Sequence, residues 1–103
     1  MPVDEIDLLK NRIAEQISPL KIYLFGSFAE GKQTEESDFD FYVVVSDDTK
    51  DMVETTAKAY KSIRHVKQRS VDIIVEINSR FEERKYMATL ENEVFTKGIL
   101  IYG

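Results

Sequence analysis

The 103-residue chain contains no cysteine, no tryptophan and a single histidine. Without cysteine it cannot form a disulfide, which is compatible with an intracellular setting. No stretch approaches the roughly 20 consecutive apolar residues that a membrane-spanning helix requires. The first ten residues are acidic and amphipathic, unlike a secretory signal peptide, which starts with positive charge. From these absences we expect a cytoplasmic protein without membrane association.

Positive charge is also scarce, because 14 lysine and arginine residues stand against 19 aspartate and glutamate residues. The net charge of −5 argues against bulk affinity for nucleic acid, although it leaves room for a local basic patch. The length suits one small domain over residues 1–103, and an apolar share of 43% is enough for an ordinary core. No internal repeat, low-complexity run or linker divides the chain.

The most informative segment is residues 25–45, which read FGSFAEGKQTEESDFDFYVVV. An apolar strand is expected to end at Gly26-Ser27, and a polar loop then leads to a second strand that opens with Asp38 and Asp40. Residues two apart in a strand point to the same face, so these two carboxylates project together. Like charges side by side need a cation beside them, and Mg²⁺ is a hard ion that prefers oxygen ligands.

The Gly26-Ser27 pair is a candidate site for a phosphate group. Backbone N–H groups that are free at the end of a strand suit an anion such as phosphate. Ser37, directly before the first aspartate, is a further candidate for contact with a nucleotide. A metal beside a phosphate site indicates phosphoryl or nucleotidyl transfer. The alternatives are an ordinary Gly-Ser turn and a solvated acidic turn before a strand.

Hydrophobic periodicity and helix breakers predict an α/β (α+β) protein with a small mixed β-sheet flanked by helices. The expected elements are a helix over 4–17, a strand over 21–25, a turn or short helix over 28–30, a strand over 39–45, a helix over about 50–63, a strand over 71–77, a mostly helical segment from 78 or 79, and a strand over 99–102. We expect Asp47 or Asp48 to cap the 50–63 helix, and Gly98 to end the last helical segment in a left-handed conformation. The apolar residues expected on one face of the 50–63 helix are Val53, Ala57 and Tyr60.

The simplest arrangement of these strands brings three carboxylates together. If the first two strands are antiparallel neighbours, Gly26-Ser27 lies beside the start of the second strand. The helix that follows allows a right-handed crossover, which places the third strand parallel and adjacent to the second. Asp72, near the start of that third strand, can then share the face of Asp38 and Asp40.

These motifs resemble the signature of the nucleotidyltransferase superfamily that includes DNA polymerase beta and kanamycin nucleotidyltransferase, and are most similar to its minimal nucleotidyltransferase branch. That branch has a hydrophobic strand, Gly-Ser, Ala-x-Gly, a spacer, Ser-Asp-x-Asp and a valine-rich strand. The matching segments are 22–25, Gly26-Ser27, 29–31, 32–36, 37–40 and 43–45. A later strand carboxylate, matched by Asp72, and the closing segment 97–102 extend the resemblance over nearly the whole chain.

The resemblance implies a polymerase-beta-like fold and Mg²⁺-dependent transfer of NMP, with AMP from ATP preferred, to an acceptor hydroxyl. Asp38 and Asp40 would hold two Mg²⁺ ions, for which Mn²⁺ can substitute. Asp72 would complete the site of the ion that activates the acceptor. The Gly-Ser motif and Ser37 would contact the nucleoside triphosphate. The resemblance further implies a partner, a small helical HEPN-type protein in a toxin–antitoxin pair. Because about 100 residues leave little to enclose an acceptor, we also expect another chain at the site, either such a partner or a second copy in a homo-oligomer.

The chain departs from the family pattern after Gly-Ser, where minimal members often have two arginines. Phe28 and Glu30 stand at those positions, so no arginine contact to a phosphate or partner can be made there. Two other functions therefore stay open. One is a metal- and nucleotide-binding module that acts through protein–protein interaction with weak or no turnover. The other is a small-molecule (drug) nucleotidyltransferase, which usually needs an added helical domain to hold its acceptor.

Other charged side chains have simpler interpretations. The basic run between Lys58 and Arg69 complements the end of a helix dipole, or it offers a site to a nucleotide tail or an acidic partner. Glu35 and Glu36 are interpreted as solvated loop charge. The lone His65 lacks the spacing of a metal ligand and is assigned no role.

Overall fold

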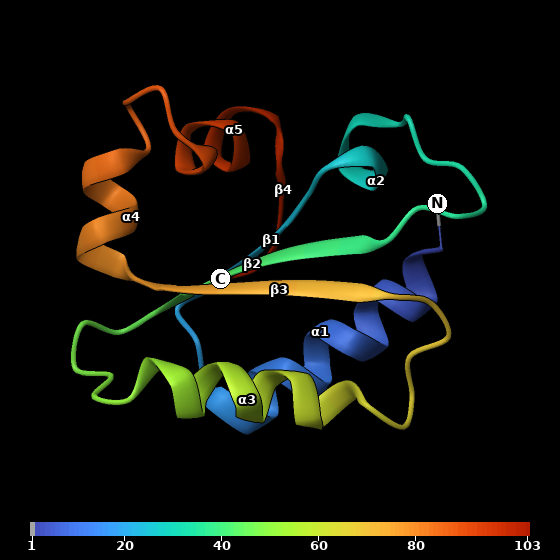
Figure 1. The fold of residues 1–103 in the computed structure, drawn as a ribbon, viewed down its shortest axis with the longest axis horizontal. Helices are drawn as coiled ribbons and strands as arrows, with labels where there is room; N and C mark the ends of the chain where they lie inside the picture. The colour runs from blue at the N-terminus through green and yellow to red at the C-terminus, as the bar shows by residue number, and fades with distance from the viewer. Residues whose placement is uncertain (1) are drawn as a thin grey trace.

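The computed structural model describes residues 2–103, which form a four-stranded sheet with helices on both faces (Figure 1). The helices are α1 (Val3–Ile17), α2 (Ser27–Glu30), α3 (Met52–Ile63), α4 (Asn78–Arg84) and α5 (Leu90–Lys97). The strands are β1 (Lys21–Phe25), β2 (Phe39–Val45), β3 (Val71–Ile77) and β4 (Ile99–Tyr102). The small mixed sheet flanked by helices is therefore confirmed.

The strands lie in the order β3-β2-β1-β4. The pair β1–β2 is antiparallel, as the sequence predicted, and β1–β4 is antiparallel too. The pair β2–β3 is parallel and is joined through α3, which confirms the expected crossover. As a result, the end of β1 and the starts of β2 and β3 meet at one end of the sheet.

The two faces of the sheet are covered by different helices. Figure 1 shows α1 and α3 on one face, and α4 and α5 on the other. Strand β2 is buried on both sides, so its apolar run reads FDFYVVV without the usual alternation. Phe39, Phe41 and Val43 belong to the core under α1 and α3. Tyr42 and Val44 belong to the smaller core under α4 and α5. Asp40 lies between Phe39 and Phe41, so it projects toward the α4–α5 side.

The acidic loop after β2 caps helices differently from the prediction. The cap of α3 is Asp51, whose Oδ1 accepts the backbone N–H of Glu54 at 2.9 Å, so the expectation of Asp47 or Asp48 was wrong. Asp47 instead accepts the backbone N–H of Ser79 at 2.8 Å, at the start of α4. The helix starts later in the chain than expected, because a turn occupies residues 47–48.

Two further expectations need correction. Gly98 is extended, with φ −77°, rather than left-handed. Glycine is needed there because a Cβ would lie 2.3 Å from the carbonyl oxygen of Val94. On α3, Val53, Ala57 and Tyr60 share one face as expected, but that face is exposed, and the side chains that enter the core are Ala59 and Ile63.

No helix among residues 2–103 combines the length and the hydrophobicity needed to cross a bilayer.

Candidate active site

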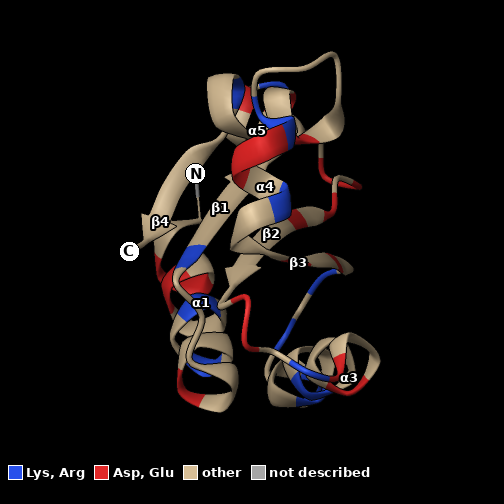
Figure 2. Cartoon of the chain, turned by 90° about the vertical axis from the view of Figure 1, so that its left-hand side faces the viewer, with Lys and Arg blue, Asp and Glu red and all other residues tan. Residues whose placement is uncertain are grey.

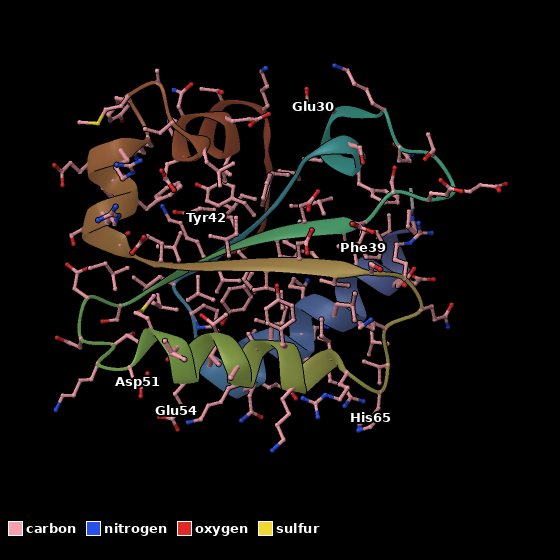
Figure 3. The ribbon with its side chains drawn as sticks, viewed as in Figure 1. Glu30, Phe39, Tyr42, Asp51, Glu54 and His65 are labelled. Carbon is pink, nitrogen blue, oxygen red and sulfur yellow. The ribbon has the colours of Figure 1, made fainter. Side chains whose placement is uncertain are left out.

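The three aspartates predicted as site residues lie at one end of the sheet. Asp40 is opposite Asp72 in the parallel register of β2 and β3, and opposite Phe25 in the antiparallel register of β1 and β2. Gly26 follows Phe25 directly, so the Gly-Ser motif adjoins the same carboxylates. In Figure 3 the label of Phe39 marks this start of β2, near α2. The strand pairing thus brings together residues 32 positions apart in the sequence.

Burial and like charge act together on Asp40. Its side chain is half-buried, whereas Asp38 and Asp72 are exposed. Desolvation, followed by the negative charges of Asp72 and Asp38, raises the pKa of Asp40 to about 6. A carboxylate in this position ionises reluctantly unless positive charge is placed beside it.

The chemistry of this carboxylate cluster can be compared with what a divalent cation requires. Among residues 2–103, no three acidic, histidine or cysteine side chains already converge into a finished metal site. The donors are nonetheless hard carboxylate oxygens, the kind that Mg²⁺ and Mn²⁺ prefer. Burial, and then the charges of Asp72 and Asp38, raise the pKa of Asp40, and a bound cation would offset both by stabilising the ionised carboxylate. The residues present therefore fit a divalent ion chemically.

Gly26 contacts this cluster directly. It has φ +76° and forms the N-terminal cap of α2. A Cβ on Gly26 would lie only 2.4 Å from Oδ2 of Asp40, so no side chain fits between the turn and the carboxylate. Gly26 is therefore required for two reasons, its positive φ and its close approach to Asp40.

The two serines predicted to contact nucleotide differ in their surroundings. Ser27 is half-buried at the first position of α2. The hydroxyl of Ser37 is used within its own loop, where it accepts the backbone N–H of Thr34 at 2.8 Å. Nucleotide contact by either serine stays a prediction.

Arg69 is a site residue that sequence reasoning missed, because it was treated as part of a solvated basic run. Its Nη1 donates to the carbonyl oxygen of Ser37 at 3.1 Å. Its guanidinium lies over the rings of Phe28 and Phe39, 4.9 and 5.1 Å from their centroids. Its Nε is 3.9 Å from Oε1 of Glu5 on α1. Arg69 thus holds the loop that contains Asp38 against the core.

Phe28, which replaces the family arginine, explains part of this arrangement. It is 4% exposed and its ring centroid lies 4.6 Å from that of Phe39. The Phe28 side chain lies in the core, and the guanidinium of Arg69 lies over its ring and over that of Phe39.

A buried polar network lies behind the carboxylates on the same face of the sheet. Tyr42, two residues after Asp40, donates its hydroxyl to Oε2 of Glu91 at 2.8 Å. Nε of Arg84 donates to Oε1 of the same carboxylate at 2.9 Å. Burial acts to raise the pKa of Glu91, but the hydrogen bonds from Arg84 and Tyr42 outweigh it and leave that pKa lowered. The network joins α4 and α5 to β2.

Comparison with known proteins agrees with this geometry. The family model described as polymerase beta, nucleotidyltransferase matches residues 7–103. The chain belongs to this nucleotidyltransferase family. Its membership accounts for the Gly-Ser turn, the Asp-x-Asp motif and the later strand aspartate in one arrangement. No curated protein sequence matches the chain.

Solved structures share the fold of this nucleotidyltransferase. A toxin–antitoxin crystallised with AMP-PNP is 24% identical, with a TM-score of 0.64 over 100% of this chain and 74% of that one. A tyrosine-to-alanine mutant of the toxin–antitoxin MntA-HpeT is 26% identical, with a TM-score of 0.60 over 100% and 72%. A mutant of that pair with two aspartates exchanged for glutamate is 23% identical, with a TM-score of 0.61 over 98% and 71%. With the family match, they confirm the resemblance to minimal nucleotidyltransferases.

Proposed function

We propose that this nucleotidyltransferase transfers AMP from ATP to a hydroxyl of a partner protein, with Mg²⁺ held by Asp38, Asp40 and Asp72. The observation that carries the proposal is the register of β2 and β3, which sets Asp40 beside Asp72 at the end of β1 where the Gly-Ser turn lies. The acceptor oxygen would form a bond to the α-phosphorus of ATP as its proton passes to Asp72, the bond from that phosphorus to the oxygen bridging to the β-phosphate would break, and pyrophosphate would leave. Negative charge then builds on the attacking and leaving oxygens. Bound divalent ions supply the charge stabilisation that such a reaction needs.

Each residue of the site has a distinct part. Asp38 and Asp40 would share the ions, and Asp72 would complete the side that faces the acceptor hydroxyl. Gly26 leaves the Asp40 carboxylate uncovered, because any side chain there would collide with it. Ser27 and the neighbouring backbone amides would hold the triphosphate. Arg69 keeps the loop before β2 in place, so the first aspartate does not need ordering when substrate arrives.

The proposed acceptor is a protein because this site is open. Asp38 and Asp72 are exposed, and three surface hollows of about 280–430 Å³ lie elsewhere, two between α1 and α3 and one along α3. Transfer to a hydroxyl in preference to water requires that the acceptor be oriented and water excluded. A helical HEPN-type partner that covers the opening would do both. The toxin–antitoxin structures of the same fold, one with AMP-PNP, support this assignment.

A second candidate function is binding without turnover. The buried ring of Phe28 favours it, because the arginine that minimal members often have at this position is replaced by a core side chain. The chain would then bind metal and nucleotide and act through its partner only.

Labelled ATP and thermal unfolding separate these functions. Mg-ATP at millimolar concentration should raise the melting temperature by mass action, and the rise should vanish with EDTA and in Asp40→Asn. Incubation with Mg²⁺, each labelled NTP and native cell extract should label one protein acceptor, and should do so from ATP. A melting shift without any transfer would favour the binding module. An unchanged melting curve would contradict a nucleotide site.

A further inference from the structure

A basic groove runs between α1 and α3, on the face of the sheet opposite the aspartates. Two adjoining hollows of about 290 and 280 Å³ form it and share Gln16, Lys61 and Ser62. Arg12 of α1 and His65 line the first hollow, and Lys58 lines the second. Figure 3 shows His65 on the outer side of the molecule, and Figure 2 shows lysine and arginine on both helices.

The groove is positive although the chain carries a net charge of −5. Arg12, Lys58 and Lys61 line it, against the single carboxylate of Glu15. Lys58 has an ion-pair partner, Glu54, at 3.4 Å. Within residues 2–103, neither Arg12 nor Lys61 lies within 4.0 Å of a carboxylate oxygen. Two cations on facing helices therefore have no ion-pair partner within 4.0 Å in the described part of the chain, and Glu15 is the one carboxylate that lines the groove with them.

The helix dipole accounts for only part of this pattern. Lys61 lies in the last turn of α3, where a cation stabilises the negative end of the helix. Arg12 lies on the other helix and gains nothing from that dipole. The convergence of the two side chains on one hollow is a tertiary feature, which the basic run in the sequence did not reveal.

We propose that this α1–α3 groove binds an acidic helix of a protein partner. Lys58, Lys61 and Ser62 of α3 line the second hollow. The first hollow is lined by Lys61 and Ser62 together with His65 and Val66 just beyond the helix, so the two hollows are displaced along α3 by about one turn. One helical turn is about 5.4 Å, which matches two carboxylates four residues apart on a docked helix. Gln16, shared by both hollows, adds a neutral amide donor between the two positions, whereas the hydroxyl of Ser62 already donates to the carbonyl oxygen of Ala59 at 2.6 Å.

Charge favours a protein over a nucleic acid as the occupant. A long phosphate backbone would extend past these few cations and meet the acidic remainder of the surface. A short acidic helix would contact only the groove. The proposal does not depend on nucleotidyl transfer, because this groove and the aspartates lie on opposite faces of the sheet.

The proposed acidic-helix site can be tested by titrating the full chain into three labelled probes and measuring the fluorescence anisotropy of each probe. These are an alanine-based helical peptide with glutamate at every fourth position, the same peptide with glutamine, and oligothymidine of similar length. We expect the glutamate peptide to bind, the glutamine peptide not to bind, and added salt to weaken the complex. The double reversal Arg12→Glu with Lys61→Glu should weaken glutamate-peptide binding about tenfold or more.

The matched control reverses two exposed lysines outside the groove, Lys50→Glu with Lys97→Glu, and should leave peptide affinity within about twofold. If the groove reversal fails to fold by circular dichroism, Arg12→Gln with Lys61→Gln replaces it. Equal binding of both peptides, or equal weakening by both reversals, would overturn the proposal. Tighter binding of oligothymidine that is lost only in the groove variant would assign the groove to nucleic acid and also overturn it.

Discussion

Asp40 and Asp72 lie side by side, in register, on the parallel strands β2 and β3. Neither strand could place both carboxylates alone, and the crossover through α3 brings them together. Because burial and the neighbouring charges raise the pKa of Asp40 to about 6, the pair is under electrostatic strain in the metal-free protein.

Stability of the metal-free protein should fall between about pH 4 and pH 6. The pKa of Asp40 is raised in the folded state above the unfolded value of about 3.9. The folded state therefore holds the Asp40 proton more tightly than the unfolded state does. This adds to the free energy of unfolding in full below pH 4, and the added stability is lost as pH rises through about 6. In urea unfolding with EDTA, the free energy of unfolding of Asp40→Asn minus that of the wild type should increase over this interval. A difference that stays constant with pH would contradict the prediction.

Divalent-ion binding should require Asp38 and Asp40. Asp38→Asn and Asp40→Asn should each abolish Mn²⁺ binding in calorimetric titration while the fold persists, because neutralising one of several repelling carboxylates does not itself destabilise. Glu35→Gln removes an equal charge from the exposed loop nearby and serves as the control. Equal Mn²⁺ affinity in the wild type and both aspartate variants would rule out the site.

Gly26→Ala should damage the site, whereas Gly31→Ala should not. Both glycines have positive φ, +76° and +72°, so both substitutions should cost about 1–3 kcal/mol of backbone strain. Only at Gly26 would the new Cβ meet a neighbour, 2.4 Å from Oδ2 of Asp40, and nothing lies within 4 Å at Gly31. Mn²⁺ affinity should therefore drop in the first variant alone. Matching losses in both would show that the close contact is unimportant.

Arg69→Ala should loosen the loop before β2. It removes the hydrogen bond to the Ser37 carbonyl and the stacking on Phe28 and Phe39, at a cost of about 1–3 kcal/mol in unfolding free energy. We also expect Mn²⁺ affinity of the folded fraction to fall about tenfold, since Asp38 follows Ser37 directly. Arg69→Lys should restore little, because lysine lacks the planar fork. Exposed Arg64→Ala is the control, and an equal effect there would refute a positioning role.

Tyr42→Phe should destabilise the protein by about 1–3 kcal/mol, because the buried carboxylate of Glu91 loses a donor 2.8 Å away. Tyr86→Phe, at a side chain 75% exposed, should change the unfolding free energy by less than about 0.5 kcal/mol. Urea denaturation measures both. Similar values for the two variants would mean that the Tyr42 hydroxyl contributes nothing beyond a surface group.

Much of the fold could be predicted because its signals are local. The strand bounds followed from apolar runs ended by Gly26-Ser27 and opened by Asp38 and Asp40. The strand directions followed from the lengths of the connections, since a long helical crossover permits parallel pairing and a shorter loop permits antiparallel pairing. Residue alternation then placed Asp38 and Asp40 on one face, and the parallel pairing of β2 with β3 added Asp72 to it.

The errors arose where several local solutions were equally good. Asp47, Asp48 and Asp51 are all acceptable helix caps by residue type. The folded chain uses Asp51 for α3, while Asp47 accepts a hydrogen bond from the start of α4. Val53 and Tyr60 have the spacing of a buried face, yet Ala59 and Ile63 meet the core. The hydroxyl of Tyr60 instead lies 2.8 Å from the backbone nitrogen of Ile73, on the open edge of β3, where it satisfies a group that has no neighbouring strand.

The sequence by itself determined the element types, the strand order that brings Asp40 to Asp72, and the family. Only the tertiary structure decided which polar and charged side chains pair with one another near the site. Arg69 and Ser37 are 32 residues apart, and Tyr42 and Glu91 are 49 apart, so no local pattern could pair them. Such pairs form because packing removes polar groups from water, and each buried group must then find a partner that only the folded chain brings within reach.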